Sequence, residues 1–282
     1  MPAAKGAFLK RRNLWIAGGL LIVLLLGSLM LSRPKGKLPT LPSPNGYEDF
    51  LKAAEIYDDS IVPPMFSETE WTEQNKKDFL EANREALRLI EAGLSKEVGQ
   101  IHDLEPEMNY ISFIFWSTSW KLFVVRAELE DQFSLQEGHI QALRYSRSMR
   151  TGGDAVQFLR GIAMEEMILN SVVDRIEEFE PKGLQELIEF LMAFESEEND
   201  IDEIVRVSCV IYESEEWNLI DDISFRWNQR SFTYSGSLRK PLVEIGSKKN
   251  AQCREVIKML ESHLAVIKAK ASPEAVSPSP SR

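Results

Sequence analysis

The residues of this chain that could carry chemistry are few, and the most suggestive are the paired glycines Gly152 and Gly153. A glycine loop that opens a helix can hold a phosphate on its free backbone amides. In RSMRTGGDAVQ, however, the segment before the glycines has a helical rather than a strand pattern, so the dinucleotide fingerprint and the P-loop are absent. Asp154 is placed to cap the next helix, and its carboxylate would occupy those amides and repel an anion. We therefore expect a turn between two helices, with Gly152 in the left-handed conformation.

The neighbouring residues of this turn fit the same interpretation. Arg144, Arg147 and Arg150 fall in the last turns of the preceding helix, where cations interact favourably with the helix dipole. Gln157 follows Asp154 by three residues, which is the spacing of a capping box. The pattern predicts a helical hairpin rather than a phosphate site.

One nucleophile motif is present. Ser237-Leu238-Arg239-Lys240 matches the SxxK pattern of serine–lysine enzymes. The companion SDN and KTG motifs are missing, and Pro241 argues against a helix that carries both side chains. A hydrolase that uses this pair, or two carboxylates without a motif, is the alternative function.

Metal-ligand patterns are weak. The three histidines, His102, His139 and His263, form neither an HExxH motif nor the ExxH pairs of di-metal bundles. A dense acidic cluster comprises Glu195, Glu197, Glu198, Asp200, Asp202 and Glu203. It lacks the EF-hand pattern, because Ile204 and Val205 stand where a ligand and a glycine are required. We expect a solvated acidic helix junction, and the sequence designates no catalytic, cofactor-binding or metal-binding residue.

The chain has two cysteines, Cys209 and Cys253, at no metal-ligand spacing. In an oxidising compartment they can form one disulfide, and two buried free thiols are equally consistent with the sequence.

An uncharged apolar run near the N-terminus predicts a membrane anchor at 13–32. The run Leu14–Leu31 has 18 residues, which as a helix span about 27 Å and approach the thickness of a bilayer's hydrocarbon core. A cleaved signal peptide has a shorter apolar run and a small-residue cleavage site. A twin-arginine export signal at Arg11-Arg12 is a further alternative, but the length and apolar character of the run favour an uncleaved span.

Charge is distributed unevenly around this span. Seven basic residues and no acid precede residue 38, which leaves 26 basic and 44 acidic residues after it, a net charge of −18. So acidic a domain is repelled by phosphate backbones, which disfavours nucleic-acid binding. The basic flank 1–12 favours a cytoplasmic N-terminus and places the acidic domain in the periplasm or outside the cell. The expected localisation is the cell membrane, with residues 14–31 in the lipid bilayer.

The rest of the chain predicts an all-α domain at 45–270. A proline-rich spacer at 33–44 precedes it, and a Ser/Pro-rich tail at 271–282 with the composition of disordered segments follows it. Helical periodicity and capping signals place helices at 45–59, 68–93, 109–127, 134–150, 155–179, from Pro181 onward, 201–222 and 249–269, with 228–246 as loop or a short strand. The helices are expected to form hairpins that pack as a bundle or a solenoid-like stack.

Two of these helices carry further expectations. In 68–93, Asn83 shares a stripe with Leu80 and Leu87 and needs a hydrogen-bond partner if buried, and Gly93 is expected to close the helix. In 109–127 an aromatic row recurs at helical spacing, formed by Phe113, Trp116, Trp120 and Phe123. Such a row can line a ligand pocket, but the core of a helical domain is the better interpretation.

A resemblance to a group of proteins rests on the apolar span and four later stretches: NGYEDFLKAAEIY, EANREALRLIEAGLSKE, RTGGDAVQFLRGIAMEE and RKPLVEIGSKKNAQC. Together they resemble uncharacterised bacterial single-pass membrane proteins with a helical outer domain, over about residues 13–260. The motifs are structural, so the resemblance implies an anchor and a helical domain but no activity or site.

The function expected from the sequence is therefore that of a membrane-anchored helical domain that binds another protein at the cell envelope. It rests on the absence of catalytic motifs and on the grooves that helical hairpins present to partners. The hydrolase named above is one alternative, and a structural spacer of the envelope is another.

Overall fold

The computed structural model describes residues 40–61, 71–99, 113–196, 200–214 and 234–271, all of which belong to one compact unit, Leu38–Arg282. The flank 1–12, the expected span 13–32, residues 33–39 of the spacer and the tail 272–282 lie outside these residues. Within the described ranges, no helix has both the length and the apolar character needed to cross a bilayer.

The described part of the chain is helical, which confirms the all-α fold class. The helices are α2 (Gly46–Ile56), α3 (Glu73–Ala82), α4 (Arg84–Leu94), α5 (Phe113–Thr118), α6 (Lys121–Leu129), α7 (Leu135–Arg150), α8 (Ala155–Asp174), a 3-10 turn η1 (Ile176–Glu178), α9 (Pro181–Ser196), α10 (Ile201–Ser214) and α12 (Tyr234–Ala271).

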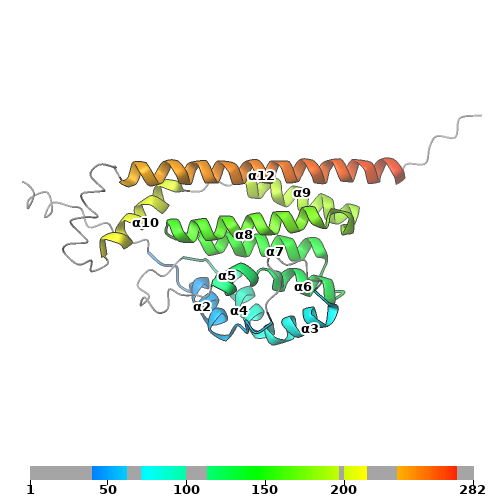
Figure 1. Ribbon diagram of the computed structural model, residues 1–282, viewed down its shortest axis with the longest axis horizontal. Coiled ribbons are helices and arrows are strands. Elements are labelled where there is room, and N and C mark those ends of the chain that lie inside the picture. The colour runs from blue at the N-terminus through cyan, green and yellow to red at the C-terminus, as the bar shows by residue number, and fades with distance from the viewer. Residues whose placement is uncertain (1–39, 62–70, 100–112, 197–199, 215–233, 272–282) are drawn as a thin grey trace, which may run out of the picture. The chain divides into compact units, whose positions relative to one another are not determined.

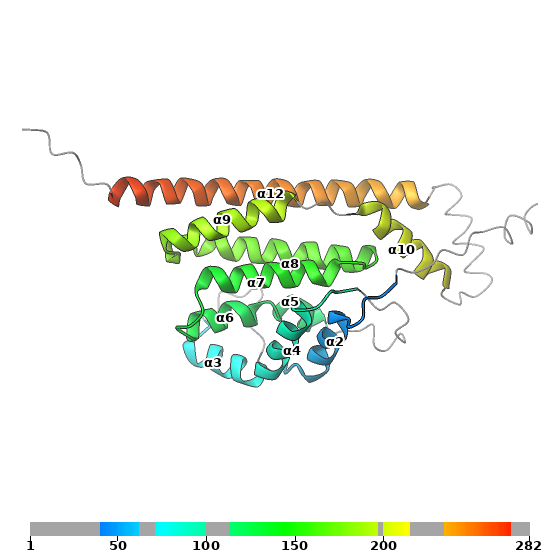
Figure 2. The same cartoon turned by 180° about the vertical axis from the view of Figure 1, so that it is seen from behind.

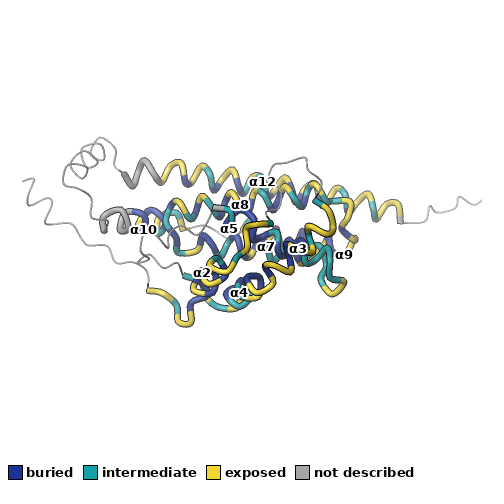
Figure 3. Tube along the Cα trace, turned by 60° about the horizontal axis from the view of Figure 1, so that its bottom comes forward, coloured by how far each residue is buried: buried dark blue, intermediate teal, exposed yellow. Residues whose placement is uncertain are grey.

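The helices of this unit pack in layers (Figures 1 and 2). The long helix α12 runs along one edge, where it packs on α9, α10 and α8. The antiparallel pair α7 and α8 forms the middle, and α6 packs on α7 from the other side. The pair α2 and α4 contacts α7 through α4 and through the ring of Phe50 on α2, which packs on Tyr145, while α3 packs on α6. Figure 3 shows that the faces between layers are buried and that α12 keeps a long exposed face.

The first helical pair depends on a cap and on two glycines. The Asn45 side chain accepts a hydrogen bond from Tyr47 N at 3.1 Å and caps α2, as the sequence predicts. Gly93 lies inside α4 instead of closing it. The position requires glycine because a Cβ there would lie only 2.7 Å from the Gly46 carbonyl oxygen. The expectation that Gly93 ends the helix is therefore wrong, since its role is to let α2 and α4 approach closely.

The single helix expected at 68–93 is two helices within the described residues, and Asn83 is the reason. Its side chain turns back to the α2–α3 connection, where Oδ1 accepts from Asp58 N at 2.8 Å and Nδ2 donates to Asp58 O at 3.1 Å. Asn83 is fully buried, so these bonds meet its predicted need for a partner. The chain bends at this residue, between α3 and α4.

The aromatic segment is also divided, into α5 and α6. Around the break, Thr118 Oγ1 donates to the Ile114 carbonyl at 2.6 Å and Trp120 Nε1 donates to the Ser117 carbonyl at 2.9 Å. Such side-chain bonds to the backbone compete with a continuous helix. Trp116, Trp120 and Phe123 are nevertheless buried in the main core, which confirms the core interpretation of the row, while the side chain of Phe113 lies outside the described residues.

The later helices differ from the expectation at two places, the end of α8 and the start of α12. Pro181 begins α9, and α10 begins at Ile201; the helix expected at 155–179 ends at Asp174 and continues as η1. The expectation of loop or strand up to residue 246 is wrong for residues 234–246, because α12 runs through Pro241. Next to it, Leu242 is 1% exposed, in a small core with α8 and α10. We attribute the continuity of α12 to this burial, which offsets the hydrogen bond lost at the proline.

Candidate functional site

The Gly-Gly turn joins α7 to α8, as the sequence predicts. Gly152 has φ 70°, the left-handed conformation that the sequence predicts. The Asp154 carboxylate accepts a hydrogen bond from Gln157 N at 2.9 Å and so caps α8. No reciprocal bond from the Gln157 side chain accompanies this cap among the described residues, so the capping box is only half formed.

Arg150 beside this turn has a role that the sequence analysis missed. Its side chain is 5% exposed, and Nε donates to Glu165 Oε1 on α8 at 2.7 Å, with the Glu165 side chain fully buried. Arg150 stands at the end of α7, as expected, but its main partner is a buried carboxylate rather than the helix dipole. Arg147 also points inward, with its guanidinium 4.4 Å from the ring centroid of Phe194.

A second cation reaches the same carboxylate from the far end of the sequence. Lys249 on α12 is 1% exposed, and its Nζ lies 3.3 Å from Glu165 Oε2. The same Nζ lies 4.3 Å from the ring centroid of Phe194 on α9. Burial lowers the pKa of Lys249, and the charge of Glu165 opposes that shift. Arg150, Glu165 and Lys249 form the Glu165 cluster, which joins α7, α8 and α12.

The Glu165 cluster lies on the inward stripes of its helices. On α8, Glu165 continues the spacing of Phe158, Ile162 and Ile168, all of which are buried. Gly161 gives the Arg150 chain room, because a Cβ there would lie 2.7 Å from Arg150 Cβ. Lys249 follows Leu242 and precedes Cys253 on one face of α12. A signal was therefore present in the sequence: three charges occupy positions at which the periodicity requires apolar residues.

Access decides what the Glu165 cluster can do. A general base or a nucleophile must come within hydrogen-bond distance of a substrate. The three side chains are between 0 and 5% exposed, so no substrate reaches them in this conformation. Their chemistry is that of a buried ion network that fixes the position of α12 against α7 and α8.

His139 is a second buried titratable group, and it too serves the fold. Its Nδ1 lies 2.9 Å from the Leu135 carbonyl and its Nε2 lies 3.1 Å from Ser171 Oγ. Burial lowers the pKa of His139 from 6.5 to about 4. The imidazole is therefore neutral at pH 7, with Nδ1 donating to the carbonyl and Nε2 accepting from the serine. His263 is half-buried on α12, and His102 lies outside the described residues.

The Ser-Lys motif lies at the start of α12. Lys240 is exposed, and the side chain of Ser237 lies outside the described residues. Helical placement of both residues contradicts the expectation drawn from Pro241. The hydrolase alternative stays a prediction.

The described members of the acidic cluster form ion pairs with arginines or cap a helix. Glu195 pairs with Arg254 at 2.7 Å, Asp202 pairs with Arg239 at 2.6 Å, and Asp200 caps α10 through Glu203 N at 2.9 Å. Among the described residues, no three His, Cys, Asp or Glu side chains come together as metal ligands. Glu197 and Glu198 lie outside this part of the chain.

Cys253 carries a free thiol in the main core. Its Sγ donates to the Leu191 carbonyl of α9 at 3.7 Å, and burial raises its pKa to about 11. The side chain of Cys209 lies outside the described residues, so a disulfide between the two stays a prediction.

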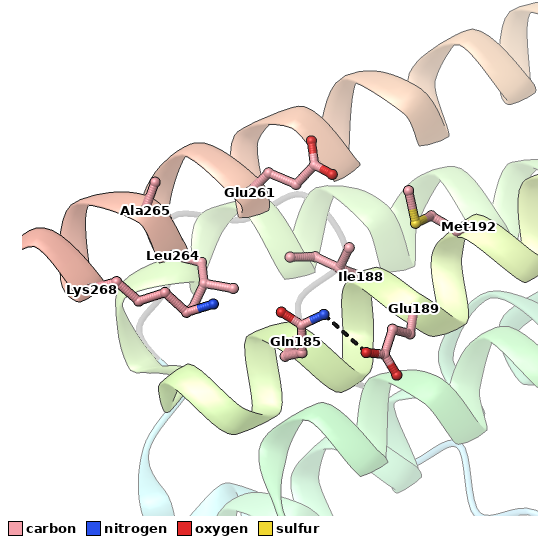
Figure 4. Close-up of a pocket in the computed structure, with 8 residues that line it drawn as sticks. All are labelled: Gln185, Ile188, Glu189, Met192, Glu261, Leu264, Ala265 and Lys268. Carbon is pink, nitrogen blue, oxygen red and sulfur yellow. Dashed lines mark hydrogen bonds between the residues drawn. The ribbon is translucent and has the colours of Figure 1, made fainter.

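Among the described residues, an open groove between α9 and α12 is an accessible candidate site (Figure 4). It has a volume of about 420 Å³ and is lined by Gln185, Ile188, Glu189, Met192, Glu261, Leu264, Ala265 and Lys268. Ile188 lies near its middle and Leu264 lies beside Lys268, while Lys268 and Met192 lie towards opposite ends (Figure 4). Met192 is 52% exposed, which is unusual for so large an apolar side chain. The groove thus presents an apolar floor between charged rims.

In comparisons with protein-family models, with curated proteins and with solved structures, nothing matches this chain. The resemblance to bacterial single-pass membrane proteins stays a prediction.

The Glu165 cluster predicts large and coupled effects on stability. We expect Glu165→Gln to lower the free energy of unfolding by roughly 3 kcal/mol, because two buried cations lose their counter-charge. Lys249→Met in the Glu165→Gln background should cost less than in the native chain, with a coupling of about 1 kcal/mol or more. Denaturant titration of the native chain, the two single variants and the double variant measures both the loss of stability and the coupling.

The matched control for this double-mutant cycle of Glu165 and Lys249 is Lys248→Met. Lys248 is the neighbour of Lys249 and pairs with Glu244 at 3.0 Å on the exposed face of α12. Loss of this surface pair should change the stability by less than about 0.5 kcal/mol. Equal effects of the two lysine substitutions would contradict the role given to the Glu165 cluster.

His139 predicts a loss of stability in mild acid. Its folded pKa of about 4 lies below its unfolded value of 6.5, so between these values the unfolded chain takes up a proton and the folded chain does not. The native protein should therefore lose roughly 3 kcal/mol as pH falls from 6.5 to 4, beyond what its carboxylates contribute. Denaturant melts of the native chain and of His139→Gln across this range isolate the effect, since glutamine does not titrate. Parallel pH profiles for the two proteins would show that His139 is not the cause.

Proposed function

We propose that this chain is a single-pass membrane protein whose helical domain binds a partner protein through the groove between α9 and α12. The observation that carries the proposal is the composition of that groove. The half-exposed Met192 and the exposed Ala265 offer apolar contact above the buried Ile188 and Leu264, and Glu189, Glu261 and Lys268 line the groove around them. An apolar centre with a polar rim is the usual anatomy of a protein-binding surface.

The shape of the groove favours a helix as the element that the partner presents. Two helices, α9 and α12, form its walls, and an amphipathic helix can lay its apolar face between them. Methionine adapts its shape to such a face more readily than branched side chains do. Among the described residues, the Glu165 cluster and His139 are inaccessible to substrates, which favours binding over catalysis as the function.

The proposed membrane anchor rests on the sequence alone. Residues 14–31 are uncharged and long enough to span, and basic residues stand on both sides of them. With the N-terminus in the cytoplasm, the acidic domain faces the periplasm or the exterior.

The anchor has a direct test. The full-length chain should stay in the membrane fraction after alkaline carbonate extraction, and protease added outside the cytoplasmic membrane should remove a tag placed after Arg282. Leu24→Arg combined with Leu25→Arg should release the chain, since each arginine at the centre of a span costs about 3 kcal/mol. A native chain extracted by carbonate, or a tag protected from protease, would contradict the anchor or its orientation.

The groove is tested by two exposed methionines on different surfaces. A photo-cross-linking residue replaces Met192 in the groove or Met259 elsewhere on α12, which is 42% exposed, in the full-length chain in cells. We expect a discrete protein adduct from position 192 and none of that mass from position 259. The reason is that only Met192 lines the groove. The same adduct from both positions, or from neither, would contradict binding through this surface.

A further inference from the structure

The groove between α9 and α12 has an acid on each of its two rims. Glu189 lines it from α9 and Glu261 lines it from α12, and both side chains are exposed. Figure 4 shows Ile188 between these two carboxylates. Met192 follows Glu189 by three residues, about one helical turn, so the half-exposed methionine belongs to the same acidic part of the groove.

Neither carboxylate is neutralised by a base of this chain. Glu189 accepts a hydrogen bond from the Gln185 amide at 2.9 Å, and among the described residues neither Glu189 nor Glu261 forms an ion pair. Lys268 is the only base among the described residues that line the groove. It lies towards the end opposite Met192 and already has an interaction within the chain (Figure 4). The part of the groove around Met192 therefore presents apolar groups between two unpaired acids.

The charge of the whole domain acts in the same direction. Residues 38–282 have a net charge of −18, and within α9 three acids, Glu186, Glu189 and Glu195, stand against one base, Lys182. A surface of one sign attracts a partner of the opposite sign and repels a partner of its own sign. An acidic partner is therefore disfavoured, and a basic partner is favoured both during the encounter and in the complex.

The placement of the acids on opposite rims restricts the partner further. A helix that lies along the groove, with its apolar side chains on Met192, has one flank towards α9 and the other towards α12. Glu189 then faces one flank of this helix, and Glu261 faces the other. Bases on both flanks of the apolar stripe reach the two carboxylates, whereas bases on the opposite face of the helix point into solvent.

We propose, resting on the function proposed above, that the partner bound by the groove presents a basic amphipathic helix with lysine or arginine on both flanks of its apolar stripe. The stripe covers Met192 and the exposed Ala265, and the flanking bases pair with Glu189 and Glu261. An amphipathic helix in an apolar groove is a recurring mode of recognition between proteins. The charge pairs at the rim contribute mainly to the rate of encounter and to the choice of partner.

The test uses three designed helical peptides that share one leucine stripe. The first has lysines on both flanks of the stripe, the second has the same lysines on the opposite face, and the third has glutamates on both flanks. Fluorescence anisotropy of each labelled peptide is measured with the full-length chain in nanodiscs of phosphatidylcholine, whose net charge of zero does not attract a basic peptide. We expect the first peptide to bind about tenfold more tightly than either of the others, because only its charges meet both acids.

Substitutions at the rims provide the matched arm of this test. Glu189→Gln combined with Glu261→Gln should weaken the first peptide roughly fivefold, because two charge pairs are lost, and should leave the second peptide unchanged. Glu255→Gln is the control, since Glu255 pairs with Lys258 at 2.9 Å on the exposed side of α12 outside the groove. It should leave all three peptides unchanged. Raising the salt concentration from about 50 mM to about 500 mM should weaken the first peptide on the native chain, a result that requires no variant to fold.

The proposal is overturned if the first peptide does not bind, if either of the other peptides binds as tightly, or if the double rim variant binds the first peptide as well as the native chain does. If one of these results is obtained while position 192 still gives its adduct in cells, the groove remains a protein-binding surface and only the basic helix is excluded. If position 192 gives no adduct, the proposed function itself fails.

Discussion

The structure depends on how one carboxylate is buried. Glu165 lies at the centre of the layered helices, and its two oxygens face Arg150 of α7 and Lys249 of α12. Removing an ion from water costs several kcal/mol, so the arrangement is stable only while all three groups stay together. It therefore specifies position as well as stability: sliding α12 by one turn would leave a buried cation facing apolar side chains. Nothing in a purely apolar interface penalises such a shift as strongly.

The position of α12 in turn determines the shape of the groove through which we propose that a partner binds. Beyond Lys249, the same helix is held on α9 by the thiol of Cys253 on the Leu191 carbonyl and by the ion pair of Arg254 with Glu195. These contacts align Leu264 with Ile188, and thereby build the groove. A buried network in the middle of the domain and an exposed surface at one edge are thus parts of one arrangement.

Sequence reasoning succeeded where the cause is local and failed where it is not. The caps at Asn45 and Asp154, the start of α9 at Pro181 and the need of Asn83 for a partner follow from neighbouring residues. The path of α12 through Pro241 depends on packing against helices far away in the chain. The Glu165 cluster was missed because its members are up to 99 residues apart, although each charge occupies an apolar position of its stripe. The sequence predicted that helical hairpins present a groove to a partner, but it did not predict which helices form the groove. Its two walls, α9 and α12, come from separate regions of the sequence.

The central claim is that Glu165 and Lys249 hold α12 firmly to the rest of the domain, and amide hydrogen exchange of the full-length protein tests it most directly. If the claim is correct, the amides around Lys249 in α12 exchange as slowly as those around Glu165 in α8, and both exchange only through global unfolding. The slow amides of α12 should then respond to denaturant with the same slope as those of α8. Exchange of α12 through a separate opening of lower free energy, with α7 and α8 still protected, would show that the helix detaches independently and would contradict the account.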